Sequence, residues 1–198
     1  MSGPATLDYA GYLDLLRRTG PPRMAWIPLA ELDEERTGFA VHLAFTAQGL
    51  VLVRNRERAC WELPGGRKEP GERSLDTARR ELAEECGAGP AELRPWCGYE
   101  VRLGERVTRG LLCLTFLSEL PGPPPESEIA EARVVRRWPG ALCYPHIQGR
   151  ILQQAARRLI ARPDVPALPE LPNSLLSILI DAPPPLGEIP PPPQNRPA

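Results

Sequence analysis

The spacing of apolar residues divides the chain into helix-like and strand-like segments. Between residues 7 and 18 apolar side chains recur every three or four positions, which predicts a helix ending before Thr19-Gly20-Pro21. A second helix is predicted over 147–160 by the same spacing. Short apolar or partly alternating runs predict strands at 39–45, 50–53, 111–117 and 132–135. Strands interleaved with helices predict a layered domain of the α/β (α+β) class.

Proline marks a boundary near residue 162. Of the 26 prolines in the chain, 12 lie within 163–198. Because proline lacks a backbone donor and fixes φ, this region is predicted to be an extended tail. An apolar island at 173–180 interrupts it and either docks on the domain's own surface or binds a partner. The predicted organisation is an N-terminal helix and linker (1–36), a folded domain (37–162) and a proline-rich C-terminal tail (163–198).

Composition narrows the class of protein. Hydrophobic residues make up 42% and charged residues 25%, which excludes a wholly disordered chain, and the net charge of -1 argues against general nucleic-acid binding. The five cysteines form no C-x-x-C pair, which predicts reduced thiols rather than a disulfide scaffold or zinc ribbon. The first residues show no signal-peptide pattern, and the longest apolar stretch is too short for a bilayer. A soluble, cytoplasmic protein without membrane contact is predicted.

Residues 61–88 predict a strand, a glycine loop and a helix in succession. Turn residues at 64–66 and 70–71 end the strand near Leu63, and Ser74 is a candidate N-cap for the helix. Gly87 is suited to end that helix in a left-handed conformation. Apolar side chains spaced by three and four form its buried stripe: Leu75, Ala78, Leu82 and Cys86.

The polar face of the same helix gathers carboxylates. Glu81, Glu84 and Glu85 are spaced by one, three and four residues, so they fall within one patch, and Glu72 can fold back towards them through the loop. Like charges at these spacings destabilise a helix, whereas hard divalent cations such as Mg²⁺ bind clustered oxygen ligands. Taken alone, such a cluster is far more often a solvated acidic face on a surface helix.

The spacing in this stretch resembles the Nudix box, G-x5-E-x7-R-E-U-x-E-E-x-G-U, where U is a bulky aliphatic residue. The matching positions are Gly66, Glu72, Arg80, Glu81, Leu82, Glu84, Glu85, Gly87 and Ala88. Ala88 is the one departure, because it is smaller than the usual aliphatic residue. The resemblance covers roughly residues 37–160.

Membership of this family implies an α-β-α sandwich around a mixed sheet and hydrolysis of nucleoside diphosphates linked to another moiety. By position, the resemblance makes Glu81, Glu84 and Glu85 the ligands of Mg²⁺, or of Mn²⁺ as a substitute, with one of them as the candidate base. The Gly66 carbonyl would join the metal shell. Glu72 and Arg80 would brace the loop and the helix as a hydrogen-bonded pair.

Candidate residues also lie outside the box. In some relatives a base or a further ligand lies in the loop before the last strand, which makes Glu126 and Glu128 candidates here. Arg54 follows the second strand and is a candidate for contact with substrate phosphate. Plain surface charge is the alternative for all three. His42 and His146 do not pair with a cysteine at ligand spacing, so structural roles are predicted for both.

The substrate class is left open by the residues beyond the box. Relatives that act on ADP-ribose often carry a proline about sixteen residues downstream, and some diadenosine polyphosphate enzymes a tyrosine, but Gly104 occupies that position. This leaves a MutT-like pyrophosphohydrolase acting on a nucleoside di- or triphosphate derivative, a small-molecule partner. The alternatives are an ADP-ribose or nucleotide-sugar pyrophosphatase and a non-catalytic nucleotide sensor. A homodimer is compatible with the sequence.

Overall fold

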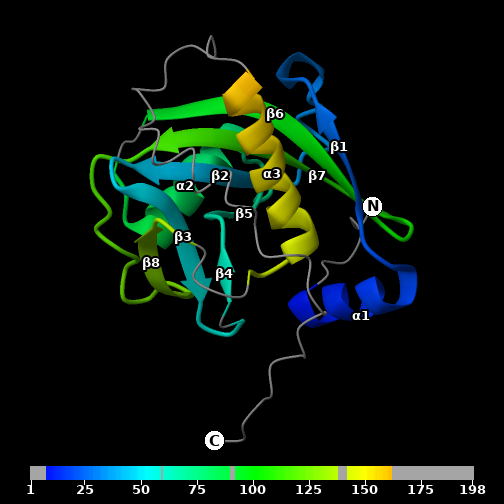
Figure 1. Cartoon of the computed structure of the whole chain (residues 1–198), viewed down its shortest axis with the longest axis horizontal. Helices are drawn as coiled ribbons and strands as arrows, with labels where there is room; N and C mark the ends of the chain where they lie inside the picture. The colour runs from blue at the N-terminus through cyan, green and yellow to red at the C-terminus, as the bar shows by residue number, and fades with distance from the viewer. Residues whose placement is uncertain (1–7, 59, 90–91, 138–141, 162–198) are drawn as a thin grey trace, which may run out of the picture.

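A mixed eight-stranded sheet between helices forms the protein (Figure 1). The structure is a computed structural model that describes residues 8–58, 60–89, 92–137 and 142–161. The predicted proline-rich tail and its island at 173–180 lie outside the described residues. The elements in chain order are α1 (Tyr9–Thr19), β1 (Arg23–Ile27), the short 3-10 helix η1 (Leu29–Glu31), β2 (Phe39–Thr46), β3 (Gly49–Asn55), β4 (Trp61–Glu62), β5 (Gly65–Arg67), α2 (Ser74–Cys86), β6 (Glu92–Leu103), β7 (Arg106–Phe116), β8 (Ile129–Val135) and α3 (Pro145–Ala161).

The strand order places the glycine loop beside the centre of the sheet. The main path runs β1-β6-β7-β2-β3-β4, while β5 pairs with β2 and β8 pairs with β3. The β2–β7 pair is parallel and the other pairs are antiparallel, so the sheet is mixed. Helix α3 covers one face and α2 the other (Figure 1). The predicted α-β-α sandwich is confirmed.

Apolar side chains fill the space on both faces of the sheet. Leu52 and Leu112 pack against Ile151 and Leu152 of α3 in the largest buried cluster. On the opposite face Leu82 of α2 packs in a smaller cluster with strand residues that include Val51, Val53 and Ile129. Burial of such side chains contributes about 1.5–3 kcal/mol each, so both helices are held firmly on the sheet.

The N-terminal segment contributes more than the helix and linker predicted for 1–36. Strand β1 lies at one edge of the sheet, where Met24 pairs with Val101 and Trp26 with Tyr99 of β6. Neither β1 nor β6 was predicted. The apolar alternation of β6 over Tyr99, Val101 and Leu103 is a usable signal, but a bulge between Pro95 and Cys97 interrupts the strand.

The expectation of reduced thiols is wrong for two of the five cysteines. Cys60 and Cys143 form a disulfide, with their Cα atoms 5.3 Å apart, although 83 residues separate them in the sequence. The backbone N–H of Cys143 donates to the carbonyl of Trp61 at 2.7 Å, which brings the two segments together. The other three cysteines lie buried outside this disulfide: Cys86, Cys97 and Cys113. Cysteine usage therefore does not support the predicted reducing compartment.

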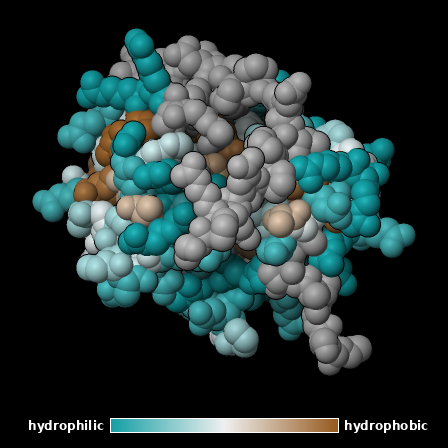
Figure 2. Space-filling view, turned by 90° about the horizontal axis from the view of Figure 1, so that it is seen from below, coloured by the Kyte–Doolittle hydropathy of each residue, from teal (hydrophilic) through white to brown (hydrophobic). Residues whose placement is uncertain are grey.

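Where described residues form the surface in Figure 2, most of it is hydrophilic and hydrophobic atoms show in limited areas. Leu29 and Val107 are the large hydrophobic side chains that remain exposed within the described part of the chain. Among the helices that the structure describes, none is long and apolar enough to cross a membrane.

Candidate active site

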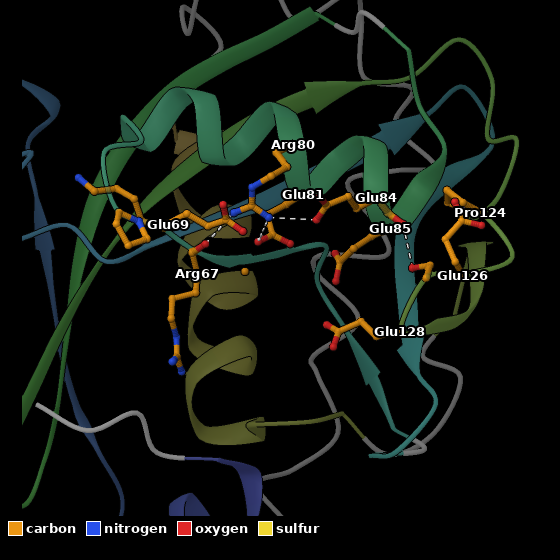
Figure 3. Close-up of a pocket in the computed structure, with 13 residues that line it drawn as sticks. Arg67, Glu69, Arg80, Glu81, Glu84, Glu85, Pro124, Glu126 and Glu128 are labelled. Atoms are coloured by element: carbon orange, nitrogen blue, oxygen red, sulfur yellow. Dashed lines mark hydrogen bonds and ion pairs between the residues drawn. The ribbon is translucent and has the colours of Figure 1, made fainter. Parts of the chain in front are cut away.

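Three glutamates on α2 point into one cleft, as the spacing of the box predicts (Figure 3). Glu81 and Glu85 are buried, whereas Glu84 is exposed: 11% of the Glu81 side chain is accessible, against 56% of the Glu84 side chain. Glu85 Oε2 accepts a hydrogen bond of 2.7 Å from the backbone N–H of Gly65. The carboxylates are therefore presented at different depths, from the cleft floor to its solvent-facing rim.

The glycine loop packs so closely against α2 and β2 that neither Gly65 nor Gly66 has space for a side chain. An ideal Cβ on Gly66 would lie 2.4 Å from Glu81 Oε1, and one on Gly65 would lie 2.3 Å from the carbonyl oxygen of Ala40. Gly65 also has a φ of +140°, which residues with a side chain rarely adopt. Gly66 thus lets the backbone of β5 lie directly against Glu81, and Gly65 lets it lie against the backbone of β2.

Arg80 connects the loop to the acidic face of the helix. Its Nε donates to Glu72 Oε1 at 2.8 Å, and its Nη2 donates to Glu72 Oε2 at 3.1 Å and to the Arg67 carbonyl at 2.8 Å. Its Nη1 donates to Glu81 Oε1 at 2.9 Å and to Glu84 Oε2 at 3.0 Å (Figure 3). The Arg80 hydrogen bonds lower the pKa of Glu72 to about 2. The predicted Glu72–Arg80 pair forms, and it is part of a larger network.

The pKa values of the two buried carboxylates are raised, in contrast to that of Glu72. Loss of solvent raises the pKa of Glu81, against the effect of Arg80. Burial raises the pKa of Glu85 well above its usual value, and the hydrogen bond from Gly65 only partly opposes this. The charges of Glu62, Glu81 and Glu128 raise the pKa of Glu85 further. Raised pKa values at two neighbouring carboxyl groups in a cleft are typical of a functional site.

The cleft has a volume of about 750 Å³, and a second wall faces the helix. The predicted candidates Glu126 and Glu128 belong to this wall, in the loop that precedes β8. The Ser127 hydroxyl donates to the carbonyl of Glu84 at 2.9 Å, which joins the loop to the end of α2. The lining residues are Gly66, Arg67, Lys68, Glu69, Pro70, Arg80, Glu81, Glu84, Glu85, Pro124, Glu126, Ser127 and Glu128.

The structure does not bring Arg54 to this cleft. Arg54 Nη2 pairs with Glu131 at 3.3 Å, and its guanidinium lies 5.8 Å from the ring centroid of Trp61. His42 has the predicted structural role. It is fully buried and bridges Thr115 Oγ1, at 2.8 Å from Nδ1, and the carbonyl of Ala78 on α2, at 2.9 Å from Nε2. Burial lowers the pKa of His42 to about 4, so the ring is neutral and its Nε2–H donates to Ala78.

Several residues near the site escaped the sequence analysis. Arg67 and Lys68 line the cleft, but the Arg67 side chain points away from the carboxylates (Figure 3). Glu62 is buried, accepts a hydrogen bond of 2.7 Å from Arg58 Nη2, and has its pKa raised by burial. The basic residues directly after Gly66 were a usable signal for the cleft rim. Glu62 offered none, because its burial depends on how β4 pairs with β3.

The donor set fits a hard divalent cation in chemistry. Carboxylate oxygens of Glu81, Glu84 and Glu85 and the carbonyl of Gly66 are the ligand types that Mg²⁺ prefers. Because Gly66 has no Cβ, its backbone can lie directly against the Glu81 carboxylate. Within the described ranges, however, no three acidic, histidine or cysteine side chains already converge as a metal cluster. Arg80 is the cation that Glu81 and Glu84 share in this arrangement.

Comparison with known proteins decides the family. The family model described as the NUDIX domain matches residues 34–140. The chain belongs to the NUDIX family. Its Nudix fold is similar to that of a mutant of the Bacillus subtilis pyrophosphohydrolase BsRppH, with a TM-score of 0.60, 17% identity, and coverage of 73% of this chain and 92% of that one. The NUDIX domain of Shewanella oneidensis NrtR, solved in complex with ADP ribose, is similar over 66% of this chain and 95% of its own, with a TM-score of 0.51 and 19% identity.

One curated relative shows local sequence similarity to this NUDIX chain. It is the Bacillus subtilis (strain 168) protein named "Putative 8-oxo-dGTP diphosphatase", 42% identical over 45 residues. These residues are 23% of this chain and 30% of the relative. The match therefore spans less than a third of that protein.

Proposed function

We propose that this Nudix hydrolase cleaves the diphosphate linkage of a nucleoside di- or triphosphate derivative with the help of Mg²⁺ or Mn²⁺. The observation that carries the proposal is that Glu81, Glu84 and Glu85 line one cleft beside the Gly66 backbone. A bound divalent cation would neutralise phosphate charge and lower the pKa of a coordinated water. The local similarity to a relative named for 8-oxo-dGTP supports a triphosphate derivative as substrate.

Each residue of the cleft has a distinct task in this proposal. The carboxylates of Glu81, Glu84 and Glu85 and the Gly66 carbonyl would hold the cation. Arg80, fixed by Glu72, keeps the loop at its distance from the helix. In this proposal Glu128, across the cleft, accepts a proton from the attacking water.

The proposal is tested by turnover of a nucleotide panel. The purified protein would be incubated with 8-oxo-dGTP, dGTP, ADP-ribose and a nucleotide sugar, each with and without Mg²⁺, and phosphate-containing products would be quantified. We expect Mg²⁺-dependent release of pyrophosphate from a triphosphate. Cleavage of ADP-ribose or a nucleotide sugar alone would favour the pyrophosphatase alternative. Binding without turnover of any compound would favour a sensor, and the hydrolase proposal would then fail.

A further inference from the structure

Helix α2 begins without a capping side chain of its own. Its N-cap residue is Arg73, which makes no side-chain capping bond, and Ser74, predicted to be the cap, is the first residue inside the helix. The first N–H groups of a helix need acceptors from elsewhere. The Ser74 N–H donates to Glu34 Oε1 at 2.6 Å, and the Ser74 hydroxyl donates to the same oxygen at 2.9 Å. The cap of α2 therefore comes from a residue 40 positions upstream, and its negative charge suits a helix N-terminus.

The same carboxylate binds the other end of the loop. Lys68 Nζ donates to Glu34 Oε1 at 3.1 Å and to the Glu34 carbonyl at 2.6 Å. The Lys68 side chain is 16% exposed and lines the cleft. Its backbone N–H donates to the carbonyl of Gly38 at 2.9 Å. Glu34 thus joins the beginning and the end of the loop at 68–74, and the middle of that loop carries Glu72.

A rigid turn presents Glu34 to the loop. Asp33 Oδ1 accepts hydrogen bonds from the N–H groups of Glu35, at 3.1 Å, and Arg36, at 3.3 Å. The Thr37 hydroxyl donates to the Asp33 carbonyl at 2.7 Å. An aspartate that accepts from the next backbone groups is a self-contained turn. Burial would raise the pKa of Glu34, but the hydrogen bonds from Ser74 and Lys68 outweigh it, so the pKa is lowered and the carboxylate stays charged.

We propose that Glu34 is a positioning residue of the active site, acting through Lys68 and Ser74. It fixes the first turn of α2 against the glycine loop, so that Glu81 and Glu85 face the backbone of β5. The Glu72–Arg80 pair braces the loop from inside the cleft, and Glu34 braces it from outside. The inference rests on the proposed function for its kinetic consequences, but the bracing itself can be measured without substrate.

The test compares Glu34→Ala with Glu35→Ala. Glu35 is exposed in the same turn and uses its backbone N–H in the turn, so its variant controls for loss of a surface charge. Amide hydrogen exchange over 66–76 and Mn²⁺ affinity by titration calorimetry would be measured with steady-state kinetics. Because loss of a cap opens the first turn, we expect exchange at Ser74 to accelerate about tenfold in Glu34→Ala. We expect Mn²⁺ to bind about threefold to tenfold more weakly and kcat to fall more than KM changes.

A conservative variant separates positioning from simple loss of stability. Glu34→Gln keeps an oxygen acceptor for Ser74 but loses the ion pair with Lys68, so it should recover part of the Ser74 protection and of the Mn²⁺ affinity. If Glu34→Ala fails to fold, Glu34→Gln and Lys68→Met serve in its place, and both should weaken Mn²⁺ binding.

Two results distinguish failure of this inference from failure of the proposed function. Exchange, Mn²⁺ affinity and kcat in the Glu34 variants equal to those of Glu35→Ala would overturn the positioning role. The wild-type protein could hydrolyse no compound while the Glu34 variants still differ from Glu35→Ala in exchange and Mn²⁺ affinity. That result would overturn the hydrolase proposal and leave the role of Glu34 supported.

Discussion

The two walls of the cleft are built in different ways. The wall formed by β5, its loop and α2 draws on residues 65–86, and Arg80 joins its parts through contacts close in sequence. The opposite wall is the loop at 121–128, and Arg56, which lies 71 positions before Ser127, holds it. The backbone N–H of Arg56 donates to the Glu128 carbonyl and its Nε to the Ser127 carbonyl, each at 2.9 Å.

This difference predicts that the two walls contribute unequally to catalysis. The α2 wall carries the buried, closely spaced carboxylates, and its geometry is fixed by helical periodicity. The opposite wall offers more exposed groups on a loop, so its contribution depends on where tertiary contacts place it. Where the two walls meet, space is limited: a Cβ on Gly87 would lie 2.1 Å from the carbonyl oxygen of Gly122.

The largest effect is expected on the α2 wall. Glu84→Gln or Glu85→Gln removes a charge from the proposed metal shell and should lower kcat at least about 100-fold. The free energy of unfolding should change little, because relief of carboxylate repulsion offsets lost contacts. Steady-state kinetics with Mg²⁺ and urea unfolding would measure both. Near wild-type turnover of the double variant at saturating Mg²⁺ would contradict the assignment of Glu84 and Glu85 as metal ligands.

A smaller effect is expected on the opposite wall. The charge of Glu128 raises the pKa values of Glu81 and Glu85, so it acts on the α2 wall directly. Glu128→Gln should lower kcat about 100-fold, the low end for a general base, whereas Glu126→Gln, on the same loop, should change it less than about threefold. Parallel kinetics on the two variants would check the difference. A larger loss in Glu126→Gln would reverse the roles assigned to the two residues.

Loosening the loop at 121–128 should lower kcat less than removing the Glu128 carboxylate does. Arg56→Ala removes the side-chain hydrogen bonds to the carbonyls of Ser127 and Pro125, and we expect a loss of about threefold in kcat. Hydrogen exchange over 125–129 should accelerate while exchange in α2 stays unchanged. Arg17→Ala on the exposed side of α1 is the matched control. Unchanged exchange in this loop would mean that Arg56 does not hold the wall.

The smallest effects are expected in the pH dependence of stability and in the protons released when Mg²⁺ binds. Because burial raises the pKa values of Glu81 and Glu85 above 4.5, the metal-free protein should lose stability as pH rises through the raised range. A bound cation favours the ionised forms, so Mg²⁺ binding near pH 6 should release up to about one proton, and activity should rise with pH. Calorimetry in two buffers of different ionisation enthalpy would count the protons. Proton release should be smaller in Glu85→Gln. If the wild-type protein releases no protons and its activity is flat from about pH 6 to 9, the metal site is contradicted.

The carboxylate patch could be predicted because local geometry fixes it. Glu81, Glu84 and Glu85 lie one, three and four residues apart on a helix, so any helix over that segment presents them together. The loop glycines belong to the same short segment, whereas the Glu72–Arg80 pair was predicted from the resemblance to the Nudix box. Gly87 ends the helix in the left-handed conformation, with φ 63°, as its residue type predicts.

The remaining features depend on contacts that local sequence does not specify. The cap of α2 comes from Glu34 rather than Ser74, the opposite wall is held by Arg56, and Cys60 meets Cys143 across 83 residues. The sequence by itself determined the chemistry of the helix and loop, because helical periodicity and turn preferences act over a few residues. The tertiary structure alone decided which distant side chains brace them, because packing of the strands and helices selects those partners after the elements have formed.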